Sequence, residues 1–135
     1  HLIMAFPAPD MYSPDREPMK VLETSLNGLG GTLMVELREK RKLAYTTYSI
    51  YKPGLGVGGI QFYISNESTK TGTALDGMTT VLRDLVDNGL SEEEVDAAKR
   101  LAVGQYRIFS QTLAPKTMQA ASNLVNDRAV NYQEP

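Results

Sequence analysis

The chain has 135 residues, no cysteine and a single histidine, His1. A catalytic zinc ion usually takes three protein ligands, mostly His or Cys, and the H-E-x-x-H motif and its inverted form both need two histidines, so the chain has no histidine-based zinc site of its own. The formal charge of −2 gives no reason to expect a nucleic-acid partner, and no apolar run approaches the roughly 18 residues that span a membrane.

The first part of the chain predicts one strand and one helix. Residues 2–6 form a short apolar run that Pro7 ends, which indicates a buried strand. Ser13 is followed by Pro14 and Asp15, so we expect Ser13 to be the N-cap of a helix. Residues 27–28, an Asn-Gly pair, are expected to end this helix.

A second helix and a β-hairpin are expected next. Gly28, Gly30 and Gly31 indicate a tight turn between the helices, because no Lys-Ser or Lys-Thr pair follows them as a phosphate loop requires. The second helix is expected to end in the charged run 36–42. Residues 43–51 and 60–65 alternate as two strands, with one apolar face and one polar but aromatic face. This pattern is typical of a sheet with helices on one side and a cleft on the other.

The remainder of the chain, from Thr69 onward, predicts three helices. The first ends at Gly89, the second begins at a capping box formed by Ser91 and Glu94, and the third lies near Pro115. The order β-α-α-β-β-α-α-α predicts an α+β fold: a mainly antiparallel sheet of about three strands with its helices mostly on one face. We expect one domain over residues 1–135 that comes from a longer protein, because the chain begins inside an expected strand without an initiator Met.

One stretch carries a more specific signal. Residues 29–45 combine a glycine-rich helix start with Leu37-Arg38-Glu39-Lys40-Arg41-Lys42-Leu43-Ala44-Tyr45. This run resembles the L-R-E-K-R-x-L-A-Y segment of the pitrilysin, insulinase and mitochondrial processing peptidase family of zinc peptidases. The helix start at residues 13–15 and the block 88–94 occur in the same order as in that family. The resemblance covers nearly the whole chain and points to the non-catalytic, C-terminal type of domain.

The resemblance implies a role in a bipartite peptidase. Family members pair a domain that carries the inverted motif H-x-x-E-H with a related domain that lacks it, and the peptide substrate lies between them. This chain would therefore bind substrate and close the cleft, be inactive alone and hold no cofactor. Zinc is expected on the catalytic partner domain, in the same polypeptide or in a partner subunit. We expect a bacterial enzyme of the periplasm or cytoplasm, and no residue distinguishes these two compartments.

Two residues receive a role from the resemblance. The family's arginine–tyrosine pair, seven residues apart, falls on Arg38 and Tyr45, which are expected to contact the peptide near the bond to be cleaved. We also expect Tyr45 to lie on the less apolar face of its strand with Thr47 and Ser49. Arg41 is an alternative to Arg38, and both arginines also suit an ordinary solvated helix end.

Two other functions stay open at this point. The chain could be a structural or assembly module of the same fold without proteolysis, or a peptide-binding domain that adds a strand at an open sheet edge. An H-x-x-E-H motif in the parent polypeptide or a neighbouring subunit would favour the peptidase. His1, a lone histidine at the chain end, is not expected to be a metal ligand.

Overall fold

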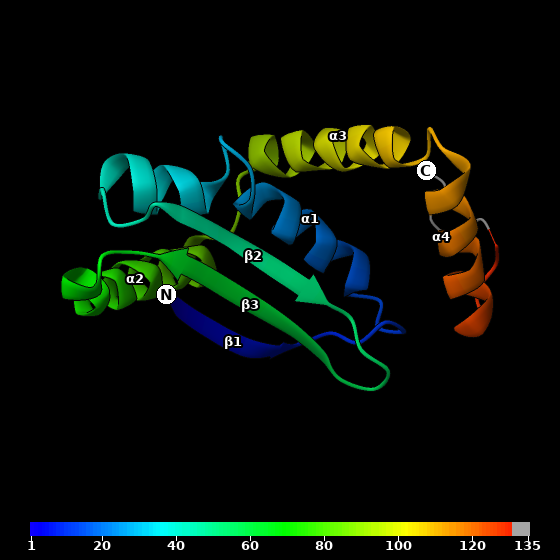
Figure 1. Cartoon of the computed structure of the whole chain (residues 1–135), viewed down its shortest axis with the longest axis horizontal. Coiled ribbons are helices and arrows are strands. Elements are labelled where there is room, and N and C mark those ends of the chain that lie inside the picture. The colour runs from blue at the N-terminus through cyan, green and yellow to red at the C-terminus, as the bar shows by residue number, and fades with distance from the viewer. Residues whose placement is uncertain (131–135) are drawn as a thin grey trace. The chain divides into compact units, whose positions relative to one another are not determined.

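The computed structural model describes residues 1–130. Its elements in chain order are β1 (Leu2–Ala8), α1 (Arg16–Leu26), the π-helix η1 (Met34–Lys40), β2 (Thr46–Lys52), β3 (Gly58–Ser65), the short 3₁₀ turn η2 (Ser68–Lys70), α2 (Thr71–Asn88), α3 (Glu92–Phe109) and α4 (Leu113–Val125), as Figure 1 shows. The predicted order of strands and helices is confirmed, with η2 as an added turn before α2.

The three strands form one antiparallel sheet. Their order is β1-β3-β2, so the β2–β3 hairpin is extended by β1 on the far side of β3. The register places Phe62 opposite both Met4 and Ser49, and Tyr63 opposite Tyr48. This confirms the predicted small antiparallel sheet. Pro7 lies within β1, where an edge strand tolerates the missing N–H group.

The chain forms two compact units, one of residues 1–98 and one from residue 99 onward, and the boundary lies within α3. In the second unit, Asn123 is buried although it is polar, and its side-chain amide donates a hydrogen bond to the carbonyl of Val130. The N–H of Arg128 returns to the carbonyl of Asn123. Oδ1 of Asn123 accepts a hydrogen bond from Nε2 of Gln119, so the buried side-chain amide is satisfied, and the two bonds to residues 128 and 130 hold the segment that follows α4.

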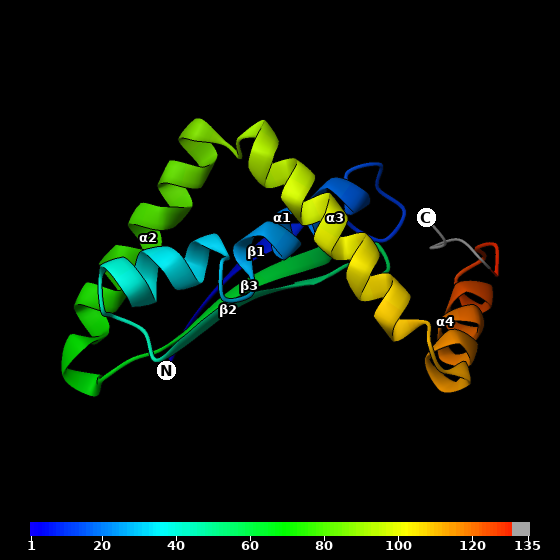
Figure 2. The same cartoon turned by 90° about the horizontal axis from the view of Figure 1, so that it is seen from above.

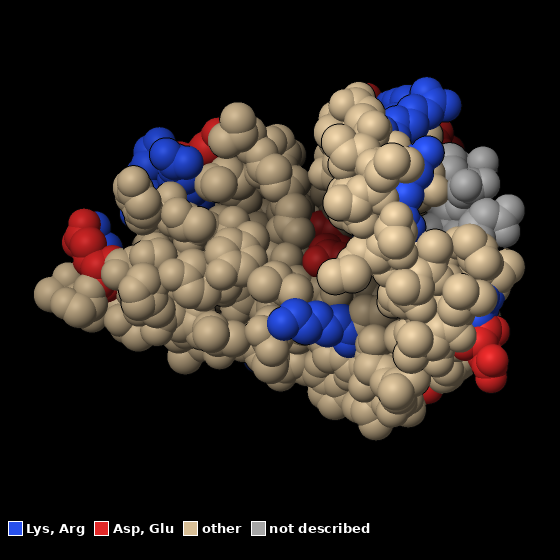
Figure 3. Space-filling model, turned by 45° about the vertical axis from the view of Figure 1, so that its right-hand side comes forward, with Lys and Arg blue, Asp and Glu red and all other residues tan. Residues whose placement is uncertain are grey.

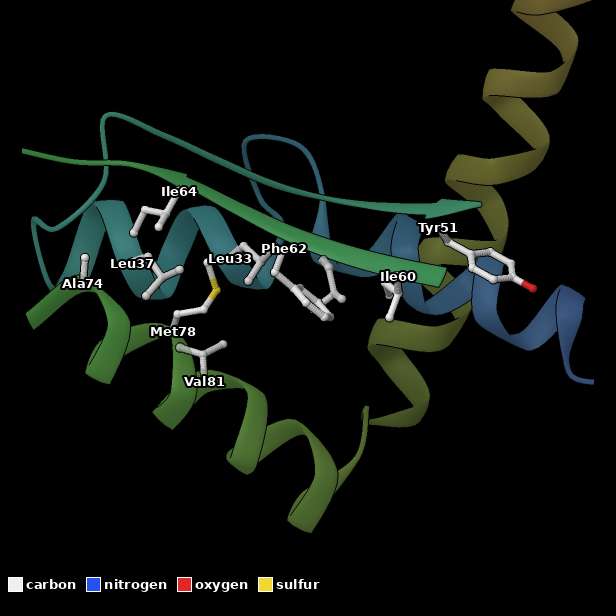
Figure 4. Packing of buried hydrophobic residues seen from close by; sticks show 10 residues of the cluster. Leu33, Leu37, Tyr51, Ile60, Phe62, Ile64, Ala74, Met78 and Val81 are labelled. Carbon is white, nitrogen blue, oxygen red and sulfur yellow. The ribbon is translucent and has the colours of Figure 1, made fainter. Parts of the chain in front are cut away.

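The core of the first unit lies between the sheet and the helices. Figure 2 shows η1, α1 and α2 on the same side of the sheet. Figure 4 shows how side chains from β3, η1 and α2 point toward one another between these layers. The fully buried members of the cluster include Leu33, Leu37, Ile64, Ala74 and Met78. Burial of one such leucine or isoleucine stabilises the fold by about 1.5–3 kcal/mol, so this cluster fixes η1 against the sheet.

The turn between α1 and η1 is as tight as predicted. Gly28 has a φ of +88°, and a Cβ atom at Gly31 would lie 2.3 Å from the carbonyl oxygen of Asn27. No side chain fits at Gly31, because backbone blocks it. The side chain of Asn27 then accepts a hydrogen bond from the N–H of Ser49 and donates one to its carbonyl, at 2.7 and 2.9 Å. The turn is therefore tied directly to β2.

The first helix begins later than predicted. It starts at Arg16 and not at Pro14, and Ser13 does not cap it. The N–H groups of Tyr12 and Ser13 bond to Oδ1 of Asp10, and Oγ of Ser13 accepts from the N–H of Asp15. These local bonds favour a turn before the helix, as Asp and Ser side chains often do.

The capping box at the start of α3 is confirmed. The hydroxyl of Ser91 accepts the N–H of Glu94, and Oε2 of Glu94 accepts the N–H of Ser91. The N–H and the hydroxyl of Ser91 both donate to this carboxylate, which favours its ionised form and lowers the pKa of Glu94. The box is the reciprocal arrangement expected from its four-residue pattern.

Candidate functional site

The helix that carries Arg38 has π geometry over Met34–Lys40. A π-helix bonds each N–H to a carbonyl five residues earlier, is rare, and is often found at functional sites. Leu37 is buried and anchors the helix, whereas Arg38, Glu39 and Lys40 are exposed. The charged run predicted from the sequence is thus solvated on one side of a well-anchored helix.

The ion pairs on this helix include Arg41 but not Arg38. The carboxylate of Glu36 binds Lys40, with a distance of 2.5 Å from Nζ to Oε1, and also binds the guanidinium of Arg41. Hydrogen bonds from Lys40 and Arg41 lower the pKa of Glu36. Nη1 of Arg41 also donates to the carbonyl of Glu36 at 3.1 Å. The guanidinium of Arg41 is therefore held on the helix itself.

Arg38 makes no such bond. Its Nη1 lies 3.8 Å from the sulfur of Met34, and within residues 1–130 no carboxylate pairs with it. Apart from this weak bond to sulfur, the N–H donors of the guanidinium are available for a ligand. Of the two arginines that the sequence left open, Arg38 is the one that an external peptide can reach without breaking an internal ion pair.

Tyr45 is held by its backbone and free at its side chain. Its N–H donates to the carbonyl of Ser65 at 2.8 Å, and its side chain is 79% exposed. The segment between η1 and Tyr45 is also fixed, because the carbonyl of Leu37 accepts hydrogen bonds from the N–H groups of both Leu43 and Ala44. Arg38 and Tyr45 thus lie at the two ends of one short, hydrogen-bonded connection.

The predicted strand position of Tyr45 is wrong. β2 begins at Thr46, so Tyr45 precedes the strand. Thr47 and Ser49 are 5% and 2% exposed and face the helices, not a cleft. They tolerate burial because their hydroxyls are satisfied: Thr47 donates to the carbonyl of Tyr63, and Ser49 to Oδ1 of Asn27.

The face of the sheet away from the helices is the aromatic one. Tyr48 and Tyr63 stack across β2 and β3 with their ring centroids 4.7 Å apart, and His1 stacks on Tyr63 at 5.7 Å. The hydroxyl of Tyr63 lies 2.6 Å from Nδ1 of His1. Ile3 is 62% exposed on the neighbouring strand, directly opposite Tyr63 in the register. The predicted polar but aromatic face exists, but Tyr48 and Tyr63 form it.

A hollow of about 300 Å³ lies beside Tyr45. It is lined by Lys42, Leu43, Ala44, Tyr45, Asn66, Glu67 and Lys70. Figure 3 shows basic side chains over η1, with acidic side chains beside them. Arg38 does not line the hollow. Lys42 was not predictable as a lining residue, because a lysine within a charged helix end carries no distinguishing signal.

The chain offers no set of zinc ligands in its described part. Within residues 1–130 no three His, Cys, Asp or Glu side chains gather as a metal site. No helix in that range is long and apolar enough to cross a membrane. A zinc ion does not fit these residues, so no chemical step at a metal is assigned to this chain.

Comparison with known proteins decides the family. The family model described as the peptidase M16 inactive domain matches residues 1–102. The chain belongs to this family. Its predicted resemblance to the pitrilysin and insulinase peptidases, in the inactive type of domain, is confirmed. No curated protein matches the chain.

Solved structures share the fold of this M16 inactive domain. A peptidase M16 inactive domain from Pseudomonas fluorescens is 24% identical, with a TM-score of 0.75 over 98% of this chain and 31% of that one. A protease from Helicobacter pylori is 18% identical, with a TM-score of 0.83 over 93% and 31%. The inactive peptidase domain of a Bordetella parapertussis protein is also 18% identical, with a TM-score of 0.80 over 96% and 70%. The chain spans about a third of the first two proteins, and these likenesses show the fold alone.

Proposed function

We propose that this M16 inactive domain binds the peptide substrate of a zinc endopeptidase and closes its cleft, without cleaving peptides by itself. The catalytic H-x-x-E-H domain would be its partner, in the same polypeptide or in a partner subunit, and would hold the zinc. The chain would accordingly be one domain of a longer protein or assembly. Membership of the inactive-domain family supports a non-catalytic part in such an enzyme.

The observation that carries the proposal is the contrast between Arg38 and Arg41. Glu36 holds Arg41 on the helix, while Arg38 is exposed and has no carboxylate partner in the described range. A guanidinium with unused donors can bind the carbonyl groups of an extended peptide. The exposed phenol of Tyr45 can donate to the oxygen that becomes negative when a peptide carbonyl is attacked.

Two substitutions test this role in the assembled protein, with its catalytic partner present. We expect Arg38→Ala to lower kcat/KM for peptide cleavage roughly ten- to a hundredfold, as the loss of a charge-assisted hydrogen bond does. Tyr45→Phe removes only the hydroxyl and should lower kcat more than it changes KM. Arg41→Ala is the matched control, because it removes an arginine that Glu36 already holds, and should change kcat/KM less than about threefold. Unchanged kcat/KM in Arg38→Ala and Tyr45→Phe would refute the proposal.

An assembly role without proteolysis is the second candidate. It is favoured by large apolar side chains on α4 that are exposed within residues 1–130, among them Leu113 at 82%, Met118 at 74% and Val125 at 85%. Apolar groups of this size commonly meet a partner surface. The parent sequence discriminates the two candidates: an H-x-x-E-H motif in it or in a neighbouring subunit supports the peptidase, and its absence from both supports the scaffold.

A further inference from the structure

We infer that the hollow beside Tyr45 binds a carboxylate group of the peptide, and that Lys42 determines this preference. The inference rests on the proposed function, because it names the class of peptide that the same region selects. The ligand group is a carboxylate, which either an Asp or Glu side chain or the C-terminus of the peptide can supply.

The charge balance of the hollow supports an anionic ligand. Its lining includes two lysines, Lys42 and Lys70, and one glutamate, Glu67, which leaves one positive charge. Lys70 is already paired with Glu67, with 3.1 Å between Nζ and Oε2. The ammonium of Lys42 has no carboxylate partner within residues 1–130. The surplus charge therefore lies on Lys42, which is exposed beside Tyr45.

The backbone of Lys42 adds a second observation. Its φ is +54°, the left-handed region that glycine adopts without cost and that other residues rarely adopt. The N–H of Lys42 bonds to the carbonyl of Arg38, which fixes this conformation directly after η1. A lysine at a position that suits glycine suggests that its side chain has a use, since backbone strain is often found at functional sites.

The remaining lining suits a peptide and not a bare anion. Oδ1 of Asn66 is buried and has no hydrogen-bond partner within the described residues, while its Nδ2 donates to the carbonyl of Glu67 at 2.7 Å. An unpaired carbonyl oxygen suits a donor such as a peptide N–H. The volume of about 300 Å³ is at the small end of ligand pockets, enough for one side chain or chain end and not for a large ligand.

The test measures binding of matched peptides to the full 135-residue chain by fluorescence anisotropy. The probes are fluorescein-labelled ten-residue pools with a central Glu or Gln, and their other positions are random among all residues except Asp and Glu. Each pool is made with a free or an amidated C-terminus. We expect the pools with a carboxylate to bind roughly two- to fivefold more tightly than the pool with none, as expected for one exposed charge pair. Tighter binding of the Glu pools than of the Gln pools would identify a side-chain carboxylate as the ligand. Tighter binding of the pools with a free C-terminus than of the amidated pools would identify a C-terminal carboxylate.

Three variants assign the effect to Lys42. Lys42→Glu should reverse the preference, and Lys42→Gly should remove it without strain in the fold. Glu67→Gln should increase it, because Lys70 loses its partner. Lys52→Glu is the matched control: it makes the same change of charge at the other end of β2, roughly 20 Å away, and should leave the preference unchanged because salt screens that distance.

Two results would overturn the inference: binding that does not depend on either carboxylate, including no binding at all, or a preference that Lys42→Glu and Lys52→Glu alter equally. Neither result bears on cleavage. If Arg38→Ala and Tyr45→Phe still lower kcat/KM in the assembled protein, the proposed function stands while the carboxylate preference fails. If they do not, and Lys42→Glu still reverses the binding preference, the carboxylate site stands without the catalytic role.

Discussion

At the scale of single residues, Glu36 decides which basic side chains of the charged run are free. It holds Lys40 and Arg41 and leaves Arg38 available. The sequence predicts the charged run but not this division, because ion pairing depends on whether partners lie four or five residues apart on the helix. Glu36 and Arg41 are five apart, and they meet because Arg41 directly follows the last residue of the π-helix.

The lowered pKa of Glu36 gives this pairing a pH dependence. A folded-state pKa below the unfolded value means that the stabilising contribution is present above the usual pKa of a glutamate and is lost as the pH falls through the folded-state value. We expect Glu36→Gln to lower the free energy of unfolding by at most about 1 kcal/mol at pH 7, since the pair is partly exposed. Urea unfolding at pH 7 and pH 3 checks this, and the difference between wild type and variant should shrink at pH 3. A difference that grows at pH 3 would contradict the assignment.

At the scale of elements, Asn27 does more than end a helix. Its amide satisfies both the N–H and the carbonyl of Ser49 on the edge of β2, and Oε1 of Glu23 accepts the N–H of Tyr51 on the same edge. The side chains of Asn27 and Glu23 thus bind backbone groups of β2 that point away from β3. Strand addition, one of the functions considered from the sequence, is blocked at these positions of that edge.

We expect Asn27→Ala to destabilise the fold by roughly 1–3 kcal/mol, because it leaves the buried N–H of Ser49 without a partner. Asn88→Ala is the control: Asn88 is an exposed asparagine, and among residues 1–130 its side-chain amide bonds only to Asp84 on its own helix. Its effect should stay within about 0.5 kcal/mol. Urea unfolding of both variants measures the difference, and equal effects would show that the link between Asn27 and β2 carries little stability.

Gly31 provides the corresponding test of the turn before η1. A Cβ atom there would overlap the carbonyls of Leu26 and Asn27, whereas one at Gly30 would meet no atom within 4 Å. We expect Gly31→Ala to cost about 1–3 kcal/mol or more and Gly30→Ala to be neutral within about 1 kcal/mol. Thermal melts of the two variants compare them directly. Equal melting temperatures would show that the turn relaxes without cost.

The elements themselves were largely predictable from the sequence. Alternation identified both strands of the hairpin, and the pattern of Ser91 and Glu94 identified a helix start to within one residue. The π geometry of η1 was not predictable, because residues 34–40 are ordinary helix-forming residues that suit an α-helix equally well. The prediction for the faces of β2 was wrong because burial also depends on partners that are distant in the sequence. Polar Thr47 and Ser49 are expected at the surface, but hydrogen bonds to Tyr63 and Asn27 satisfy their hydroxyls and allow their burial.

At the scale of the whole molecule, the family was predictable from the sequence. The resemblance at residues 37–45 identified the inactive domain of the M16 family, which the family model confirms. The pairing of Arg38 and Tyr45 with a peptide stays a proposal, because those two side chains are exposed and nothing in the chain itself shows what they bind.

Turnover per bound zinc, measured on the assembled protein with both Arg38→Ala and Tyr45→Phe, tests directly whether this domain contributes to substrate binding. We expect the zinc content to equal that of wild type, because the chain holds no metal ligands in its described range. We also expect turnover per zinc to fall at least as far as with Arg38→Ala alone. Wild-type turnover per zinc in the double variant would contradict the claim that this domain contributes to substrate binding.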